Sequence, residues 1–204
     1  MDLPLIPPII VKTLTKPFDD PEWSFDLKYD GFRGVAYIQS ADGKIISREN
    51  HRLSRFTPLE QKLPKVLGVT DAIFDGEVVV FDESKKSIFK EMLRTIYEPT
   101  YVAFDLLWLN GVDLRELPLL ERRRRLHKLL AKKDEAIQEA FSVPGRGIAL
   151  FDSVCKYDFE GIVAKKLSSP YRKKVEWFKI KNPEYSQMPN RSKIFNANRT
   201  RSKK

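Results

Sequence analysis

Apolar and polar residues alternate along several short stretches of this chain, at the period of two that a half-buried β-strand requires. The first three stretches follow one another closely, joined at Gly31 and at the turn Ala41-Asp42-Gly43, and so predict a meander. The alternation predicts strands at 24–30, 32–39, 43–48, 72–81, 101–109, 159–166 and 176–181.

Segments with helical periodicity separate these strands. They predict helices at 58–67, 87–96, 118–133 and 146–157, the third of which has Pro118 in its first turn. Strands dominate and do not alternate regularly with helices. The pattern therefore predicts an α+β fold with antiparallel sheets rather than a regular βαβ winding.

The 204 residues, of which 42% are hydrophobic, are enough for one domain with a buried core. The alternation ends after Asn182, and the last residues, RSKIFNANRTRSKK, are polar and basic. We therefore expect a folded domain at 1–187 and a flexible basic tail at 188–204.

Charge and cysteine content indicate which partners and which cellular compartment suit the protein. Lys and Arg number 37 against 28 Asp and Glu, a balance that favours polyanionic partners but also occurs in merely soluble basic proteins. The single cysteine, Cys155, excludes an intramolecular disulfide and fits a reducing compartment. The apolar start, MDLPLIPPIIV, lacks a basic region and is interrupted by prolines, so it indicates neither a signal peptide nor a membrane span. We expect a cytoplasmic protein with no membrane attachment.

Charged residues interrupt strands that otherwise have a core pattern. Each one alone is typical of the wet face of an amphipathic strand. Burying a charge is costly unless it is paired or solvated, so the set together predicts a polar cleft shared by several strands. The residues concerned are Lys28, Glu77, Glu160, Lys179 and Lys181.

Two of these strands have a pattern that indicates chemistry. In DLKYDGFRG (26–34), alternation would place Lys28 between Asp26 and Asp30 on one face. In EWFKIK (176–181), Lys179 and Lys181 share a face, where an anion such as phosphate would satisfy both. Their field would lower the pKa of a neighbouring lysine such as Lys28 and make it a nucleophile. The sequence has no glycine-rich phosphate loop, so a kinase or P-loop mechanism lacks support.

Six sequence motifs occur in order along the chain. They are KYDGFR (28–33), SRENHRLSRF (47–56), FDGEVVVF (74–81), YVAFDLLWLNGVDLRELPLLERR (101–123), EGIVAKK (160–166) and WFKIKNPEYSQ (177–187). A lone KxDG would be weak evidence, but with all six motifs the chain resembles a known family. From residue 5 to residue 187 it is similar to the nucleotidyltransferase domain of ATP-dependent DNA ligases of the bacterial and archaeal end-joining type.

The resemblance implies two antiparallel sheets with flanking helices around a nucleotide-binding cleft. It also implies that Lys28 attacks the α-phosphate of ATP, that the AMP passes to a DNA 5′-phosphate, and that a nick is sealed with Mg²⁺ or Mn²⁺ present. Glu160, Asp30 and Glu77 would bind the metal, and Lys28, Lys179 and Lys181 would be catalytic. The nucleotide would be bound by Asp26, Leu27, Lys28, Arg33, Arg48, Glu77, Phe104, Val163, Lys179 and Lys181.

Two departures from the family pattern are visible. Asp26 replaces the glutamate that usually precedes the nucleophile by two residues, which would alter the contacts to adenine. The residues after Gln187 are too few for a five-stranded oligonucleotide-binding barrel, so we expect none in this chain. We expect a monomer that acts on nicked double-stranded DNA in repair, recombination or replication, with a separate end-binding or barrel protein as a further partner.

Several alternatives remain open at this point. The same lysine chemistry would serve an RNA ligase or a capping-type nucleotidyltransferase, and a catalytically weak nucleic-acid-binding module is a third reading. Phe104 is also typical of a core aromatic, and Asp75 could support Glu77 or cap a turn. The arginine run at 122–125 and the basic tail either grip phosphates or form a solvated surface.

Overall fold

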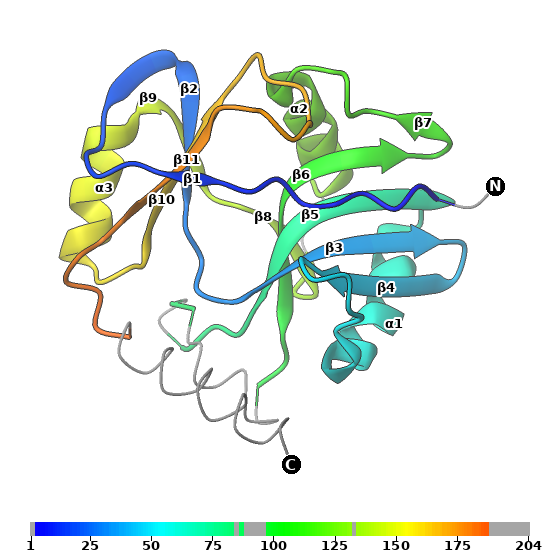
Figure 1. Ribbon diagram of the computed structural model, residues 1–204. Helices are drawn as coiled ribbons and strands as arrows, with labels where there is room; N and C mark the ends of the chain where they lie inside the picture. The colour runs from blue at the N-terminus through cyan, green and yellow to red at the C-terminus, as the bar shows by residue number, and fades with distance from the viewer. Residues whose placement is uncertain (1–2, 84–85, 88–96, 132–133, 188–204) are drawn as a thin grey trace.

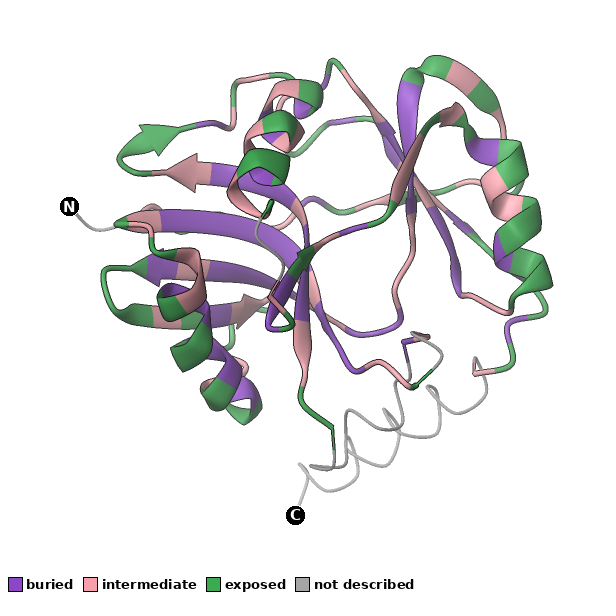
Figure 2. Cartoon of the chain, turned by 180° about the vertical axis from the view of Figure 1, so that it is seen from behind, coloured by how far each residue is buried: buried purple, intermediate pink, exposed green. Residues whose placement is uncertain are grey.

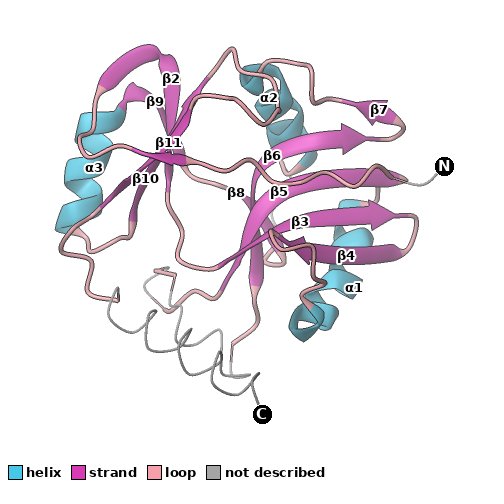
Figure 3. Ribbon diagram, in the orientation of Figure 1, coloured by secondary structure: helices cyan, strands magenta, loops and turns pink. Residues whose placement is uncertain are grey.

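The computed structural model describes residues 3–83, 86–87, 97–131 and 134–187, which form two β-sheets with helices at the periphery (Figures 1 and 3). The first sheet has the order β1-β11-β10-β2-β9 and the second β4-β3-β5-β6-β7, with β8 paired to β6. Most pairs are antiparallel; β1 with β11 and β6 with β8 are parallel. The α+β prediction is confirmed.

The strands of the first sheet are β1 (Lys12–Thr13), β2 (Asp19–Leu27), β9 (Ser142–Arg146), β10 (Gly161–Lys166) and β11 (Trp177–Lys181). Those of the second sheet are β3 (Phe32–Gln39), β4 (Asp42–Ser47), β5 (Asp71–Val79), β6 (Thr100–Leu109), β7 (Val112–Asp113) and β8 (Ile137–Glu139). The helices are η1 (Ser54–Phe56), α1 (Thr57–Leu67), α2 (Leu119–Leu129) and α3 (Gly147–Lys156).

Alternating side chains divide the second sheet between two hydrophobic cores. Ala36 and Phe74 point toward α1 and α2, whereas their neighbours Val35 and Ile73 point to the opposite face. On that face the N-terminal segment, residues 3–11, crosses the sheet, and its Ile6 is buried in the same core as Val35 and Ile73 (Figure 1). The first sheet packs its apolar face on α3. Figure 2 shows this distribution of burial: the central strands are mostly buried, whereas the helices are exposed on their outer sides.

Local sequence explains how α1 begins and ends. Pro58 lies in its first turn, where the missing N–H costs no hydrogen bond, and Leu59 and Leu63 recur on its buried face. Gly68 ends the helix with φ +60°, a left-handed conformation that glycine adopts at little cost, and donates its N–H to the carbonyl of Pro64.

Most predicted elements are confirmed in position: α1, α3, β3, β4, β5, β6, β10 and β11 begin and end within two residues of the ranges predicted from the sequence. Helix α2 ends at Leu129, earlier than predicted. The predicted helix at 87–96 lies outside the described residues except for Ser87, and the basic tail at 188–204 lies outside them altogether.

The predicted meander is wrong at its first strand. Strand β2 ends at Leu27 and belongs to the first sheet, whereas β3 belongs to the second, so residues 28–31 cross between the sheets. The backbone N–H of Lys28 donates to Gly161 of β10 at 2.9 Å. Gly31 passes so close to β5 that an added Cβ would lie 2.3 Å from the carbonyl oxygen of Val78. This crossover forms one side of the site described below.

Candidate active site

A small cavity of about 60 Å³ lies between the two sheets, at the crossover. Residues of both sheets and of the crossover contribute side chains to it, because alternate residues of β2, β10 and β11 face inward in register. The cavity brings together most of the residues predicted to bind a nucleotide. It is lined by Val11, Asp26, Leu27, Lys28, Tyr29, Arg33, Glu77, Phe104, Val163, Lys165, Trp177 and Lys179.

Lys28 is held at this cavity by its backbone and its side chain. Its Nζ donates a hydrogen bond to Glu160 Oε2 at 2.6 Å, and the Glu160 side chain is only 2% exposed. Gly161, the next residue, accepts the Lys28 N–H and has φ +152°. A Cβ at Gly161 would lie 2.3 Å from the carbonyl oxygen of Ile180, so a larger residue would displace the strand that positions Lys28.

The expected face of Asp26, Lys28 and Asp30 does not exist, because the strand has ended before Lys28. Asp30 is fully buried and does not line the cavity; its carboxylate accepts a hydrogen bond from the Tyr185 hydroxyl at 3.1 Å. Burial and the charge of Asp30 raise the pKa of Tyr185 well above its usual value. In this structure Asp30 anchors the segment that carries Tyr185.

The charge of Lys28 acts on a second lysine, Lys179. Burial lowers the pKa of Lys179, and the charges of Lys181 and Lys28 lower it further, so Lys179 lies within electrostatic reach of each of these two lysines. Trp177 and Lys179 both face the cavity, as the alternation in EWFKIK predicted. Lys181, at the end of β11, is exposed and does not line the cavity.

Arg48 lies outside the cavity lining. Its side chain is 65% exposed and pairs with Glu49 at 2.8 Å. Arg48 also contributes to the lowered pKa of Lys179, so its charge acts on the same region. Of the predicted nucleotide-binding residues, Arg48 and Lys181 thus do not line the cavity.

Arg33 is fixed by a carboxylate whose role the sequence left open. Its Nε and Nη2 donate to Asp75 at 2.7 and 2.6 Å, and the fully buried Asp75 also accepts a hydrogen bond from the Tyr171 hydroxyl at 2.8 Å. The guanidinium lies 4.6 Å from the ring centroid of Phe104. Asp75 therefore holds Arg33 against the aromatic ring in the cavity.

Asp26 lies in a buried charge network that the sequence did not predict. Its Oδ2 accepts hydrogen bonds from Arg123 and from Lys165, the latter at 2.8 Å. Burial alone would raise the pKa of Asp26, but these two cations lower it below its ordinary value. The other oxygen, Oδ1, is buried and has no hydrogen-bond partner among the described residues. Asp26 Oδ1 is therefore a hydrogen-bond acceptor in the wall of the cavity that a ligand could use.

Lys165 fills the space between two aromatic rings. Its Nζ lies 4.1 Å from the Phe104 centroid and 4.4 Å from that of Trp177, and the residue is 2% exposed. Burial lowers its pKa to about 8, against the opposing charge of Asp26. The alternation of β10 contained the signal for this residue, because Lys165 follows Val163 by two positions and shares its face.

The arginine run of α2 divides between the core and the surface. Arg122 is fully buried, the Arg123 side chain is 11% exposed, and both are paired with carboxylates, so neither gripping phosphates nor forming a solvated surface describes them. Arg124 is exposed and Arg125 is half-buried, and both pair with Glu121, as expected of the outer face of a helix. Because each residue advances 100° around a helix, four successive arginines cannot share one environment.

Residues 8–181 match the family described as the ATP dependent DNA ligase domain. The chain belongs to this family. The multifunctional non-homologous end joining protein LigD of Pseudomonas aeruginosa is 33% identical to it over 168 residues, which cover 78% of this chain and 20% of LigD. The SPbeta prophage-derived DNA ligase-like protein LigB of Bacillus subtilis is 26% identical over 196 residues, 90% of this chain and 70% of LigB.

Solved structures agree with the family of this ligase domain. A mycobacterial DNA ligase D complexed with ATP and MES superposes with a TM-score of 0.76 at 26% sequence identity, and the match covers 86% of this chain and 60% of that one. The ligase domain described here thus spans a fifth of the LigD protein and less than two thirds of that structure. None of its described helices has the length and apolarity that a membrane crossing requires.

The described part of the ligase domain contains no cluster of three or more His, Cys, Asp or Glu side chains suited to a metal ion. Mg²⁺ is often bound by one or two carboxylates together with the phosphates of a substrate. Glu160, beside Lys28, and Glu77, in the cavity lining, fit that arrangement in the presence of a polyphosphate.

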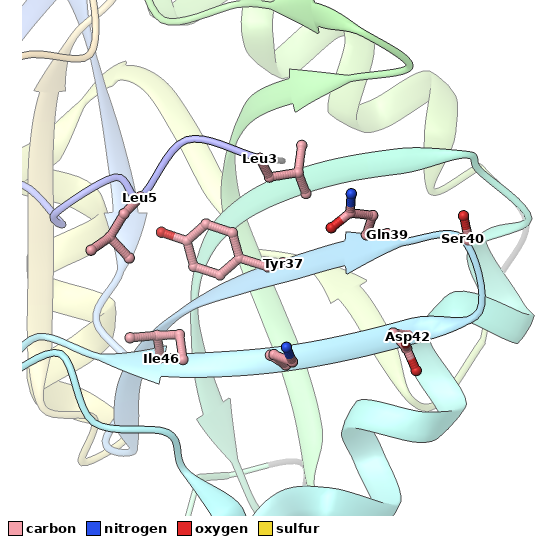
Figure 4. Close-up of a pocket in the computed structure, with 8 residues that line it drawn as sticks. Leu3, Leu5, Tyr37, Gln39, Ser40, Asp42 and Ile46 are labelled. Atoms are coloured by element: carbon pink, nitrogen blue, oxygen red, sulfur yellow. The ribbon is translucent and has the colours of Figure 1, made fainter. Parts of the chain in front are cut away.

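A larger hollow of about 530 Å³ lies between the N-terminal segment and the β3–β4 hairpin (Figure 4). Leu3, Leu5 and Ile46 give it an apolar wall, and Lys44 is the one cation among its lining residues. The smaller cavity, in contrast, is lined by several cations that could bind a phosphate. The volume of a hollow therefore does not show where the chemistry of this domain takes place.

Lys165 should make the stability of the ligase domain depend on pH. Between about pH 8, its folded pKa, and its ordinary value of 10.5, the unfolded chain binds more protons, so the free energy of unfolding should rise with pH. The expected slope is up to about 1 kcal/mol per pH unit. Lys165→Met should flatten this rise, measured by urea unfolding between about pH 7 and pH 10. A rise that persists in Lys165→Met but disappears in the control Lys166→Met would contradict the assignment.

Proposed function

We propose that this domain catalyses the adenylylation of Lys28 by ATP, the first step of DNA ligation. The observation that carries the proposal is the position of the Lys28 amine, 2.6 Å from buried Glu160, in a cavity that Lys179 and Arg33 also line. A nucleophile, an acidic group beside it and fixed cations are what attack on a phosphoryl centre requires.

In the reaction, the neutral amine of Lys28 forms a bond to the α-phosphorus of ATP. The bond from that phosphorus to the bridging oxygen breaks, and pyrophosphate leaves with the electron pair. The ammonium must first lose a proton, and Glu160 Oε2 lies at hydrogen-bond distance to accept it. A second proton leaves the same nitrogen as the P–N bond forms, and the departing pyrophosphate takes it up. Lys179 and Lys181 would stabilise the negative charge that develops on the phosphate oxygens.

The remaining residues would orient the nucleotide. We assign the ribose and phosphates to Arg33, Arg48 and Glu77, and the base to the space between Phe104 and Val163. Aromatic stacking suits an adenine, and Val163 faces the same cavity from the first sheet. The present volume of about 60 Å³ is far below that of ordinary ligand pockets, so the Phe104 ring must move when a nucleotide enters.

Asp26 would select the base. Its free acceptor, Oδ1, can receive a hydrogen bond from the 6-amino group of adenine, whereas guanine presents a carbonyl oxygen there and would place two acceptors face to face. A site with a buried polar group discriminates strongly against a ligand that leaves this group unpaired.

A divalent cation, Mg²⁺ or Mn²⁺, would be held by Glu160 and Glu77 together with the phosphates of ATP. When bound, it would neutralise phosphate charge and favour the departure of pyrophosphate. Asp30 is not included in this set, since its carboxylate is buried against Tyr185.

After adenylylation, we propose that AMP passes to the 5′-phosphate of nicked double-stranded DNA and that the 3′-hydroxyl then displaces it. The name of the Pseudomonas aeruginosa relative refers to non-homologous end joining, and we propose the same repair context here, in the cytoplasm. The protein would act as a monomer, and an end-binding or barrel-containing protein would assist on DNA.

The test is covalent labelling of the purified protein with ATP labelled in its α-phosphate and Mg²⁺. Label from ATP should exceed label from GTP by about a hundredfold. Parallel reactions with nicked DNA, nicked RNA and pre-adenylylated nicked DNA should show sealing of the DNA substrates. Preference for GTP would favour a capping-type enzyme, preference for RNA an RNA ligase, and nicked-DNA binding without any label a binding module.

A further inference from the structure

Arg123 connects helix α2 to the strand that precedes Lys28. Its Nη2 donates to Asp26 Oδ2, and its Nη1 donates to the Ser24 hydroxyl at 2.7 Å. The Arg123 side chain is 11% exposed and that of Asp26 3%. The guanidinium thus spans two alternate residues of β2, both of which face the second sheet.

These contacts fix the orientation of the Asp26 carboxylate. Lys165 donates to the same oxygen, Oδ2, so both cations hold one side of the carboxylate and leave Oδ1 without a partner among the described residues. A short carboxylate has two rotatable bonds, and without these contacts its oxygens would exchange freely. A planar guanidinium that bonds two oxygens at once restricts it more than an ammonium group can.

We propose that Arg123 is a positioning residue for base selectivity: by holding Asp26 Oδ2, it presents Oδ1 to the 6-amino group of the incoming purine. The inference rests on the proposed binding of an adenine nucleotide. Arg123 does not line the cavity, so it would contact neither the phosphates nor the reacting atoms of a bound nucleotide. Its effect therefore acts through Asp26 and depends on whether the base carries a hydrogen-bond donor at position 6.

This dependence gives a test that a merely structural role would not pass. Purine riboside 5′-triphosphate is ATP without the 6-amino group. Equilibrium dissociation constants for both nucleotides would be measured by calorimetry with the full chain, and labelling rates with α-phosphate-labelled forms. The wild-type protein should favour ATP by about tenfold or more.

In Arg123→Ala the preference for ATP should shrink to about twofold or less, through weaker ATP binding, while purine riboside triphosphate binds as in the wild type. Arg123→Lys keeps the charge but cannot span both Ser24 and Asp26, so it should give an intermediate preference. The matched control is Arg124→Ala on the same helix, whose side chain is 69% exposed. This control should keep the full preference.

The outcomes separate the two proposals. Equal loss for both nucleotides in Arg123→Ala, or no change in the preference, overturns the positioning role while leaving adenylylation standing. Selective nucleotide binding without any covalent label overturns the proposed function but supports the role of Arg123. If the wild-type protein does not distinguish the two nucleotides, Asp26 does not read position 6 and the inference fails. Thermal unfolding of Arg123→Lys, expected to remain cooperative, provides a folded variant should Arg123→Ala not fold.

Discussion

Lys28→Ala should abolish the covalent adenylyl label, reducing it by about a thousandfold or more, because no other group can replace a nucleophile that becomes part of the intermediate. Lys28 is the lysine whose amine contacts Glu160 and is held by the backbone of β10. The measurement is label retained on the denatured protein after reaction with α-phosphate-labelled ATP and Mg²⁺. Calorimetry with ATP would show whether the variant still binds the nucleotide.

Two further variants make this result specific. Lys28→Arg keeps a positive charge beside Glu160 but offers no neutral amine, so it should be as inactive as alanine. Lys166→Ala removes a lysine of β10 that is 34% exposed and absent from the cavity lining, and it should label like the wild type. Label that survives in Lys28→Ala would move the nucleophile to another residue and remove the central part of the proposed function.

The sequence could predict those site residues whose side chains face the cavity simply because of their position in one regular strand. In EWFKIK, alternation alone places Trp177 and Lys179 on a common face, and the structure confirms it at the cavity. The same logic fails for DLKYDGFRG, since the strand ends at Leu27 and the chain crosses to the other sheet. A period of two does not show where a strand leaves its sheet, because that depends on partners such as Gly161, 133 positions after Lys28 along the chain.

The strands and residues that the sequence did not predict were missed for the same reason, because they depend on partners that lie far away along the chain. Strands β8 and β9 have the sequences IQE and SVPGR, which show little alternation, and they are strands because β6 and β2 offer them free edges. Arg123 is one of four consecutive arginines, and nothing local distinguishes it from Arg124. Only the packing of α2 against the sheets decides which guanidinium reaches Asp26.

Arg122→Ala should lower the free energy of unfolding by about 3–5 kcal/mol, which is the usual cost of removing one partner of a buried ion pair. Arg122 and Asp105 are both 0% exposed, and Arg122 Nε and Nη2 each bond the carboxylate at 2.7 Å. Arg122 Nη1 also donates to the carbonyl oxygens of Leu117 at 2.5 Å and Ser169 at 3.0 Å. Its removal would leave a buried charge and two carbonyl groups without this donor. Urea unfolding at neutral pH would measure the loss.

The reason to expect a functional loss as well lies in what Arg122 connects. Asp105 belongs to β6 of the second sheet, and Ser169 follows β10 of the first, so one guanidinium joins the two sheets that enclose the cavity. The double variant Arg122→Met with Asp105→Leu removes the unpaired charge and should recover part of the stability, because apolar pairs can replace buried ion pairs. If the ion pair also sets the spacing of the two sheets, this stabilised variant should still bind ATP more weakly than the wild type. Recovery of stability together with full ATP affinity would show that Arg122 serves folding alone.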